Sequence, residues 1–291
     1  MTRNLQLQRV GLTIKEEIHQ AVGRSGLAAA TALLLLAAGG SNATAAAEPD
    51  RVEARFEIYG FAGFHVLTNR TTVEQFGDRY TIATDLNTRG LASVFVDLTS
   101  HSQVSGRLGS EVPYPESYRA DVRRNGAERH YEVDFRRDGM VINASTPLSA
   151  GRASWDQTRQ MRGAVDQLTA YFLVEKQLTV RGTCALVVPV FDGSALYNLR
   201  SIDVKRETLS ADDHQNFAGS SQVCEIVRED LVLNPDRNED TYQRGKIWYA
   251  RLIAGGQMMP VRMEFTTAFG VVKAYLAELR GRGVDVRLTP E

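Results

Sequence analysis

The chain has 291 residues, of which 43% are hydrophobic and 24% are charged, and its formal net charge at pH 7 is −1. This is the ordinary composition of a folded globular protein. The balanced charge and the lack of a basic block argue against a protein that binds nucleic acid.

The N-terminal segment has the pattern of a secretory signal. Arg24 precedes an uncharged apolar run, Gly26–Gly40, and the small residues Ala43–Ala47 follow it. A basic residue, a short apolar stretch and a small-x-small motif are the parts of a cleavable signal peptide. The run is shorter than the ~20 residues that span a bilayer, although an uncleaved membrane anchor is the alternative.

Cleavage is expected after Ala45 or Ala47, which assigns residues 1–47 to the signal peptide. Residues 48–291 then form the mature protein, which we expect to be one β domain. Export places this domain in an oxidising compartment, where disulfides persist.

Cys184 and Cys224 are the two cysteines of the chain. Two lone cysteines in an exported protein usually pair. Their disulfide would close a loop of about 40 residues and stabilise the fold by roughly 3–4 kcal/mol in the chain-entropy account. A reactive thiol is the alternative, and it would need a positively charged and partly exposed setting.

Alternation of apolar and polar residues dominates the chain from Arg51 onward. In Arg51–Tyr59 every second residue is apolar, which is typical of a strand with one solvent-exposed face. Short strands separated by turns are also expected in Phe64–Glu74, Arg79–Thr88, Ser117–Asp134, Gly139–Ala144, Leu178–Leu199, Gln222–Leu233, Lys246–Ala254 and Pro260–Leu279.

Two segments have helical spacing. The first contains Leu91, Val94, Phe95 and Leu98, and the second contains Val165, Leu168, Phe172 and Leu178. The first segment is also rich in β-forming residues, so a strand is its alternative. Asp166 falls in the first turn of the second helix, where a negative charge favours the helix dipole.

A large antiparallel sheet must curl or close to protect its edges. We therefore expect a mainly β fold with one large, strongly curled antiparallel sheet. Its form would be a half-barrel or β-spiral, similar to that of a carrier, with one or two helices packed on it.

A hairpin is predicted from Leu186–Phe191 and Ala195–Leu199. Asp192 and Gly193 form its turn, because Gly193 can adopt the positive φ that such turns need. Pro189 lacks an amide donor and is therefore expected at a sheet edge or a bulge.

The common catalytic and metal-binding signatures are absent from the sequence. The histidines after the signal segment lack the spacing of zinc ligands: His65, His101, His130 and His214. The loop Asp236–Tyr242 fails as an EF-hand because Thr241 replaces the required glycine. We expect no enzyme activity, no cofactor and no metal.

Three residues are the best candidates for a site. Asp192 would accept backbone hydrogen bonds across its turn, and Arg262 would pair with a buried carboxylate. Trp248 is the third candidate and is one of the aromatic residues at alternating strand positions. A purely structural role is the alternative for each, since Asp-Gly is above all a hairpin signal. Aromatic residues at alternating strand positions either pack the core or line a space for an acyl chain.

Several short motifs together resemble the alphaproteobacterial branch of the domain-of-unknown-function 3108 family (DUF3108). The main ones are Cys184 followed by Pro189-Val190-Phe191-Asp192-Gly193, then Phe217–Cys224, Ile247-Trp248-Tyr249-Ala250, Pro260-Val261-Arg262 and Thr267–Val272 with Gly270. Gln167 stands where the family usually has a proline. The resemblance covers nearly all of residues 48–291.

The resemblance implies a β-rich periplasmic protein of Gram-negative bacteria with no assigned activity and no catalytic residues to carry over. Curled β folds of the cell envelope are similar to carriers of lipid or lipoprotein acyl chains, which is an analogy of fold alone. The leading hypothesis is a non-enzymatic envelope protein that binds a hydrophobic ligand or an envelope partner. The alternatives are a structural or protein-interaction role with a packed core, and a hydrolase.

Overall fold

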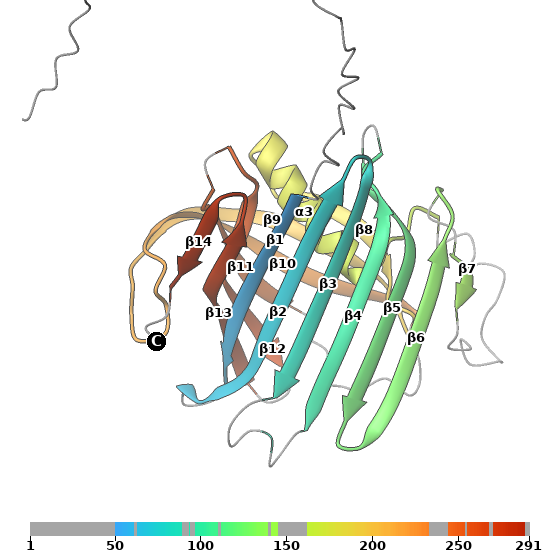
Figure 1. Cartoon of the computed structure of the whole chain (residues 1–291), viewed down its shortest axis with the longest axis horizontal. Coiled ribbons are helices and arrows are strands. Elements are labelled where there is room, and N and C mark those ends of the chain that lie inside the picture. Colours follow the sequence, from blue (N-terminus) through green and yellow to red (C-terminus); the bar gives the residue numbers. More distant parts are fainter. Residues whose placement is uncertain are drawn as a thin grey trace, which may run out of the picture. The chain divides into compact units, whose positions relative to one another are not determined.

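Fourteen strands in the described part of the chain hydrogen-bond into one antiparallel sheet (Figure 1). In chain order they are β1 (Asp50–Tyr59), β2 (His65–Phe76), β3 (Arg79–Thr88), β4 (Leu98–Arg107), β5 (Tyr114–Arg124), β6 (Ala127–Phe135), β7 (Val141–Ala144), β8 (Leu186–Phe191), β9 (Leu196–Leu209), β10 (Gly219–Val232), β11 (Arg244–Arg251), β12 (Met258–Thr267), β13 (Gly270–Gly281) and β14 (Val284–Arg287). The order across the sheet is β7-β6-β5-β4-β3-β2-β1-β13-β12-β11-β10-β9-β8, and β14 pairs with β13 beside this path. The sheet is not closed into a barrel, which confirms the predicted fold class.

This computed structural model describes residues 50–60, 63–88, 93, 97–109, 112–138, 141–144, 162–232, 244–253, 255–267 and 270–288. All of them belong to one unit, Ala46–Glu291. The expected signal peptide, its cleavage sites, most of the first expected helix and the loop Asp236–Tyr242 lie outside the described residues.

An N-terminal and a C-terminal strand of the domain pair with each other in the middle of the sheet. β1 pairs with β13, so that Val52 lies opposite Gly281 and Glu57 lies opposite Tyr275. The sheet therefore consists of two meanders, β1–β7 and β8–β13, which are hydrogen-bonded through this one pair.

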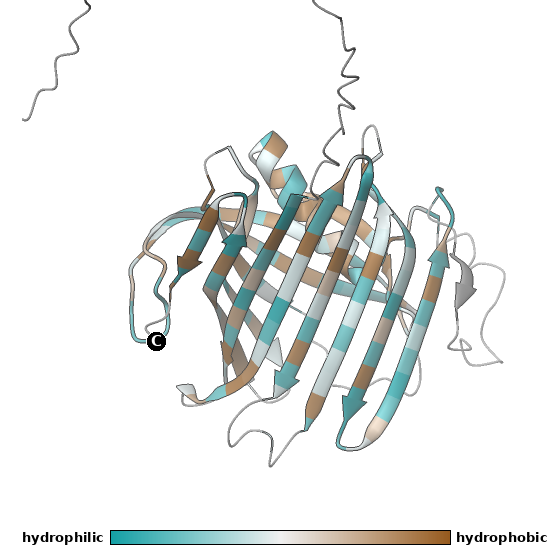
Figure 2. Cartoon of the chain, in the orientation of Figure 1, coloured by the Kyte–Doolittle hydropathy of each residue, from teal (hydrophilic) through white to brown (hydrophobic). Residues whose placement is uncertain are grey.

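Alternation sets the two faces of the sheet. Val52, Ala54 and Phe56 are buried in β1, while the charged residues between them are more exposed. Figure 2 shows the same alternation of hydrophobic and hydrophilic bands along β2–β6. β1 thus presents one apolar face to the interior, as the period of two requires.

The second expected helix is α3 (Gln167–Arg181). Asp166 is its N-cap and lies just before the first turn, where its carboxylate accepts hydrogen bonds from the backbone N–H groups of Leu168 and Thr169. Gly182 ends the helix with a left-handed conformation, φ 69°. These are the preferred residues at each end.

The helix lies on the concave side of the sheet, between β3–β6 in front and β8–β12 behind (Figure 1). Leu173, Val174 and Leu178 pack with residues of β8–β11, and Phe172 packs with β3–β6 and Phe191. α3 therefore fills the concavity that the sequence suggested as a ligand space. None of the described helical segments is long and apolar enough to cross a membrane.

Two of the expected ranges each contain two strands joined by a turn, as predicted, and two expected limits differ from the structure. Ser117–Asp134 spans two strands, because Asn125 and Gly126 form a turn with positive φ. Leu178–Leu199 begins in α3, and Pro260–Leu279 is the pair β12 and β13. Leu98, which was placed in the first expected helix, is instead the first residue of β4.

Candidate functional site

A groove of about 700 Å³ lies between α3, the edge strand β8 and the connection between β4 and β5. Its volume falls within the range of roughly 300–1,000 Å³ that is usual for small-molecule sites. Residues from three separate parts of the sequence form its walls, so no single motif marks it.

The helical wall follows from the spacing of residues in α3. Leu173, Lys176, Gln177, Val180 and Arg181 all line the groove. They stand at positions i, i+3, i+4, i+7 and i+8, which share one face of an α-helix. The C-terminal half of α3 thus places apolar and cationic side chains side by side.

The strand wall is the free edge of the sheet at β8. Leu186, Val187, Val188 and Pro189 line the groove from this side. The carbonyl of Pro189 accepts a hydrogen bond from Val165, across the edge that faces away from β9. The prolyl nitrogen points to the same edge, which confirms the expected place of Pro189 at a sheet edge.

The third wall comes from the turns at the far end of the other meander. Leu108, Val112 and Tyr114 lie in or beside the β4–β5 connection, and Arg137 follows β6. The groove therefore bridges the two ends of the open sheet.

Three exposed apolar side chains from separate parts of the chain meet in this groove. Nine large hydrophobic residues of the described chain are exposed, and three of them line it: Val112 (55% exposed), Val180 (81%) and Val187 (48%). Clustered exposed apolar surface marks binding sites more often than scattered residues do.

The groove also carries a positive charge. Arg137, Lys176 and Arg181 line it together with one acidic residue, Asp138. Asp138 is paired with Arg136. The ammonium of Lys176 lies 5.4 Å from the centre of the Phe172 ring, and burial lowers its pKa.

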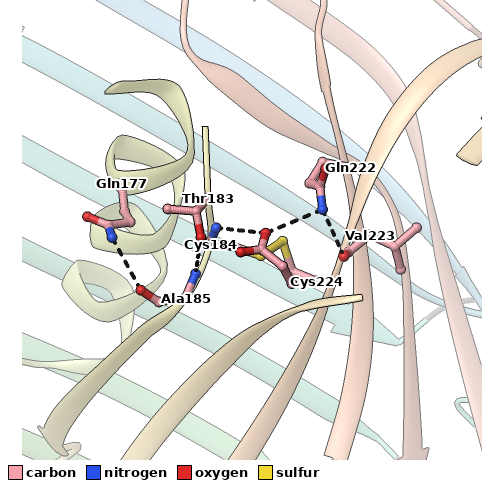
Figure 3. The surroundings of a disulfide bond; sticks show 8 residues. Gln177, Thr183, Cys184, Ala185, Gln222, Val223 and Cys224 are labelled. Carbon is pink, nitrogen blue, oxygen red and sulfur yellow. Dashed lines mark hydrogen bonds between the residues drawn. A yellow bond between two sulfur atoms is a disulfide. The ribbon is translucent and has the colours of Figure 1, made fainter. Parts of the chain in front are cut away.

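A disulfide bond anchors the segment that connects the two main walls, α3 and β8 (Figure 3). Cys184 and Cys224 are joined as predicted, and both are fully buried. Gln177 of the helical wall donates a hydrogen bond to the carbonyl of Ala185, just before β8. The disulfide therefore ties the segment between α3 and β8 to β10.

Asp203 supports this junction, and sequence reasoning missed it. Its carboxylate accepts hydrogen bonds from the backbone N–H of Cys184 at 3.0 Å, from the Thr183 hydroxyl and from the Gln222 amide at 3.3 Å. Its lone position in a charged strand gave no signal, because its partners come from two other elements.

The Asp192 turn has the predicted structure. Asp192 Oδ1 accepts hydrogen bonds from the N–H groups of Ser194 at 2.9 Å and Ala195 at 2.8 Å. Gly193 has φ 88°, and Phe191 is fully buried beside it. This turn is part of the core and does not line the groove.

The cation that pairs with Asp192 is Arg228, which the sequence did not single out. Its guanidinium lies 3.6 Å from Asp192, donates to Asp230 at 2.7 Å and stacks 3.5 Å from the centre of the Tyr197 ring. Arg228 is only 7% exposed. Two carboxylates and an aromatic face compensate for burying its charge.

Arg262 and Trp248 do lie together, but away from the groove. Arg262 stacks over the Trp248 ring at 4.7 Å and is paired with Glu264, which is only partly buried. The prediction that Arg262 pairs with a buried carboxylate is therefore wrong. The indole N–H of Trp248 donates to Glu207 at 3.1 Å, so its environment is a packed face and not a cavity.

Pro260 and Gly270 have backbone roles. Pro260 lies opposite Tyr249 where the register of β11 and β12 shifts, which is the bulge position that suits a proline. Gly270 opens β13 with φ 103°. Neither residue lines the groove.

Two acidic groups at α3 have raised pKa values: Asp166, its fully buried N-cap, and Glu175, which is partly buried in the helix. Burial raises the pKa of Asp166 to about 6, against the effect of its hydrogen bonds from Thr169 and Leu168. Thr169 also bonds to the hydroxyl of Tyr80 at 2.8 Å and thereby links the start of α3 to β3. Burial raises the pKa of Glu175 to about 8.

The described residues thus form an open, curled antiparallel sheet with a groove of about 700 Å³ beside its edge strand β8. The chain belongs to the DUF3108 family, a protein family of unknown function, whose model matches residues 55–277. This confirms the family indicated by the sequence motifs.

Among solved structures, the chain is similar to a beta-barrel-like protein of the domain of unknown function DUF1849 from Brucella abortus. The TM-score is 0.47 and the sequence identity is 13%, over 80% of this chain and 97% of that chain. No curated protein matches the sequence.

Proposed function

We propose that the mature chain is an exported, non-enzymatic protein of the cell envelope that binds an acyl chain in the groove between α3 and β8. The convergence of Val112, Val180 and Val187 on one ligand-sized space carries this proposal. Binding of a lipid or lipoprotein acyl chain would remove this apolar surface from water, which is favourable in proportion to its area.

Export to the periplasm of a Gram-negative bacterium is supported by two features. The N-terminal segment has the three parts of a signal peptide. The Cys184–Cys224 disulfide is typical of proteins from oxidising compartments.

A binding role is supported over catalysis by the composition of the groove. Its described lining contains no serine, threonine, cysteine or histidine. A serine, threonine or cysteine nucleophile beside a histidine base is therefore missing from these described walls. The apolar site lies beside α3 and not inside the sheet, because α3 fills the concave side.

Binding can be tested by introducing a charge on the exposed groove surface. Val180→Asp should weaken the binding of a fluorescent fatty acid about tenfold or more. Val271→Asp is the matched control, since Val271 is also an exposed valine but lies on β13 outside the groove. Equal effects of the two variants, or no binding by the unaltered protein, would contradict the proposal.

Export can be tested separately by expressing the full chain in a Gram-negative host. The periplasmic fraction should contain a chain that begins at residue 46 or 48 by mass spectrometry. A full-length chain in the cytoplasm would contradict this part of the proposal. Lipid mass spectrometry of the purified periplasmic protein would identify the class of any bound acyl chain.

A further inference from the structure

We infer that the groove recognises a single acyl chain that ends in an anionic group, such as the carboxylate of a free long-chain fatty acid. This inference rests on the proposed function and adds the charge of the ligand to it. Three observations carry it. The groove contains cations, aromatic rings lie against two of these cations, and the cations lie beside the exposed valines.

Among the described residues, no carboxylate pairs with Arg137, Lys176 or Arg181. The adjoining depression, which Arg137 also lines, contains an arginine of the other kind: Arg107 is paired with Asp78 and Glu116. An anionic ligand would thus supply to the three cations of the groove the charges that the described residues do not provide.

Aromatic rings support two of these cations. The Lys176 ammonium lies 5.4 Å from the centre of the Phe172 ring, and the Arg137 guanidinium lies 5.8 Å from that of Tyr114. Such contacts hold a cation without neutralising it. Both charges therefore remain available for a carboxylate, and Arg137 is able to bind one in a bidentate manner.

The arrangement matches an amphiphile. Lys176 and Val180 are one helical turn apart on α3, and Arg181 follows Val180 on the same wall. Val187 lines the opposite wall on β8. A chain lying along the groove would contact the valines while its charged end reaches Lys176, Arg181 or Arg137. The volume of about 700 Å³ suits one acyl chain better than a lipid with two.

Displacement of a neutral fluorescent dye separates the charge of the ligand from its apolar chain. The mature protein is loaded with N-phenyl-1-naphthylamine at pH 8, and hexadecanoic acid, hexadecanol and hexadecyl phosphate are compared below their aggregation limits. The acid should displace the dye at a concentration at least about tenfold lower than the alcohol. Hexadecyl phosphate, which is also anionic at this pH, should likewise displace the dye at a lower concentration than the alcohol.

Variants assign this preference to the groove. Lys176→Gln combined with Arg181→Gln should reduce the preference for the acid over the alcohol to about twofold or less and leave displacement by the alcohol unchanged. Lys246→Gln is the control, because Lys246 is an exposed lysine of β11 outside the groove.

The possible results distinguish this inference from the proposed function. Equal displacement by acid and alcohol would overturn the inference and leave acyl-chain binding intact. Displacement by the phosphate no better than by the alcohol would contradict recognition of the negative charge. If the variant with both Lys176 and Arg181 replaced still preferred the acid over the alcohol to the same degree, these residues would not belong to the site. If none of the three compounds displaced the dye, the proposed function itself would be overturned.

Discussion

Gly193 lies directly against Tyr131 of β6. A β-carbon added at residue 193 would come within 3.0 Å of the Tyr131 β-carbon. This contact brings the β8–β9 turn from one end of the open sheet against a strand near the other end. The Asp-Gly pair therefore serves the tertiary packing as well as the local turn.

Gly193→Ala is expected to destabilise the domain by about 2–4 kcal/mol. Positive φ disfavours alanine by roughly 1–2 kcal/mol, and the contact with Tyr131 adds to this. Urea unfolding measures the change. Gly126→Ala is the matched control, since Gly126 has φ 80° with no atom near the added methyl group. Equal losses in the two variants would show that the Tyr131 contact has no energetic effect.

Replacing both cysteines with serine should lower the free energy of unfolding by about 3–4 kcal/mol, because Cys184 and Cys224 close a loop with a sequence separation of 40. The reduced wild-type protein should unfold at nearly the same urea concentration as the double variant. A reductant that leaves the unfolding midpoint of the wild type unchanged would argue against a contribution of this bond.

Arg228→Met should cost about 3–5 kcal/mol, because it leaves Asp192 and Asp230 without their shared cation. Adding Asp192→Asn should recover part of this loss, which a double-mutant cycle measures. Arg200→Met is the control, since the pair of Arg200 with Glu229 is exposed and its loss should cost less than about 1 kcal/mol. Similar losses for the two arginines would contradict the assigned role of Arg228.

Glu175→Gln should stabilise the protein at alkaline pH. Burial raises the pKa of Glu175 from 4.5 to about 8, so the folded state favours the protonated carboxyl. The stability that this preference contributes is complete below about pH 4.5 and is lost as the pH rises through about 8. At pH 9 the variant should be more stable than the wild type, by a gain on the order of 2–4 kcal/mol.

Thermal unfolding between pH 4.5 and pH 9 measures this difference. Glu207→Gln is a control of opposite sign, because hydrogen bonds from Trp248 and Lys205 lower the pKa of Glu207. That variant should show no alkaline gain. A Glu175→Gln protein whose stability follows that of the wild type at every pH would show that the carboxyl is well solvated.

Local chemistry explains which parts of the fold were predictable. The limits of β3, the Asp192 turn and the caps of α3 depend on neighbouring residues, so the sequence alone indicates them. The disulfide was predictable because the chain has only two cysteines.

Contacts between distant segments explain what was missed. β4 lacks a clear apolar face because Gly106 must leave room for the hydroxyl of Tyr80, which would lie 2.6 Å from a β-carbon there. The pairing of Asp192 with Arg228, and the groove itself, join segments with no common motif. Charge and exposure become informative only when these segments are placed together.

The pairing of β1 with β13 has a kinetic consequence. The first and the second-last strands of the domain meet at the middle of the sheet, so the two meanders can be joined only when almost the whole chain is available. Contacts between such distant segments slow folding, since a long loop must close before they form. A chain that ends before β13 would carry two separate sheets with unpaired inner edges, a state prone to aggregation.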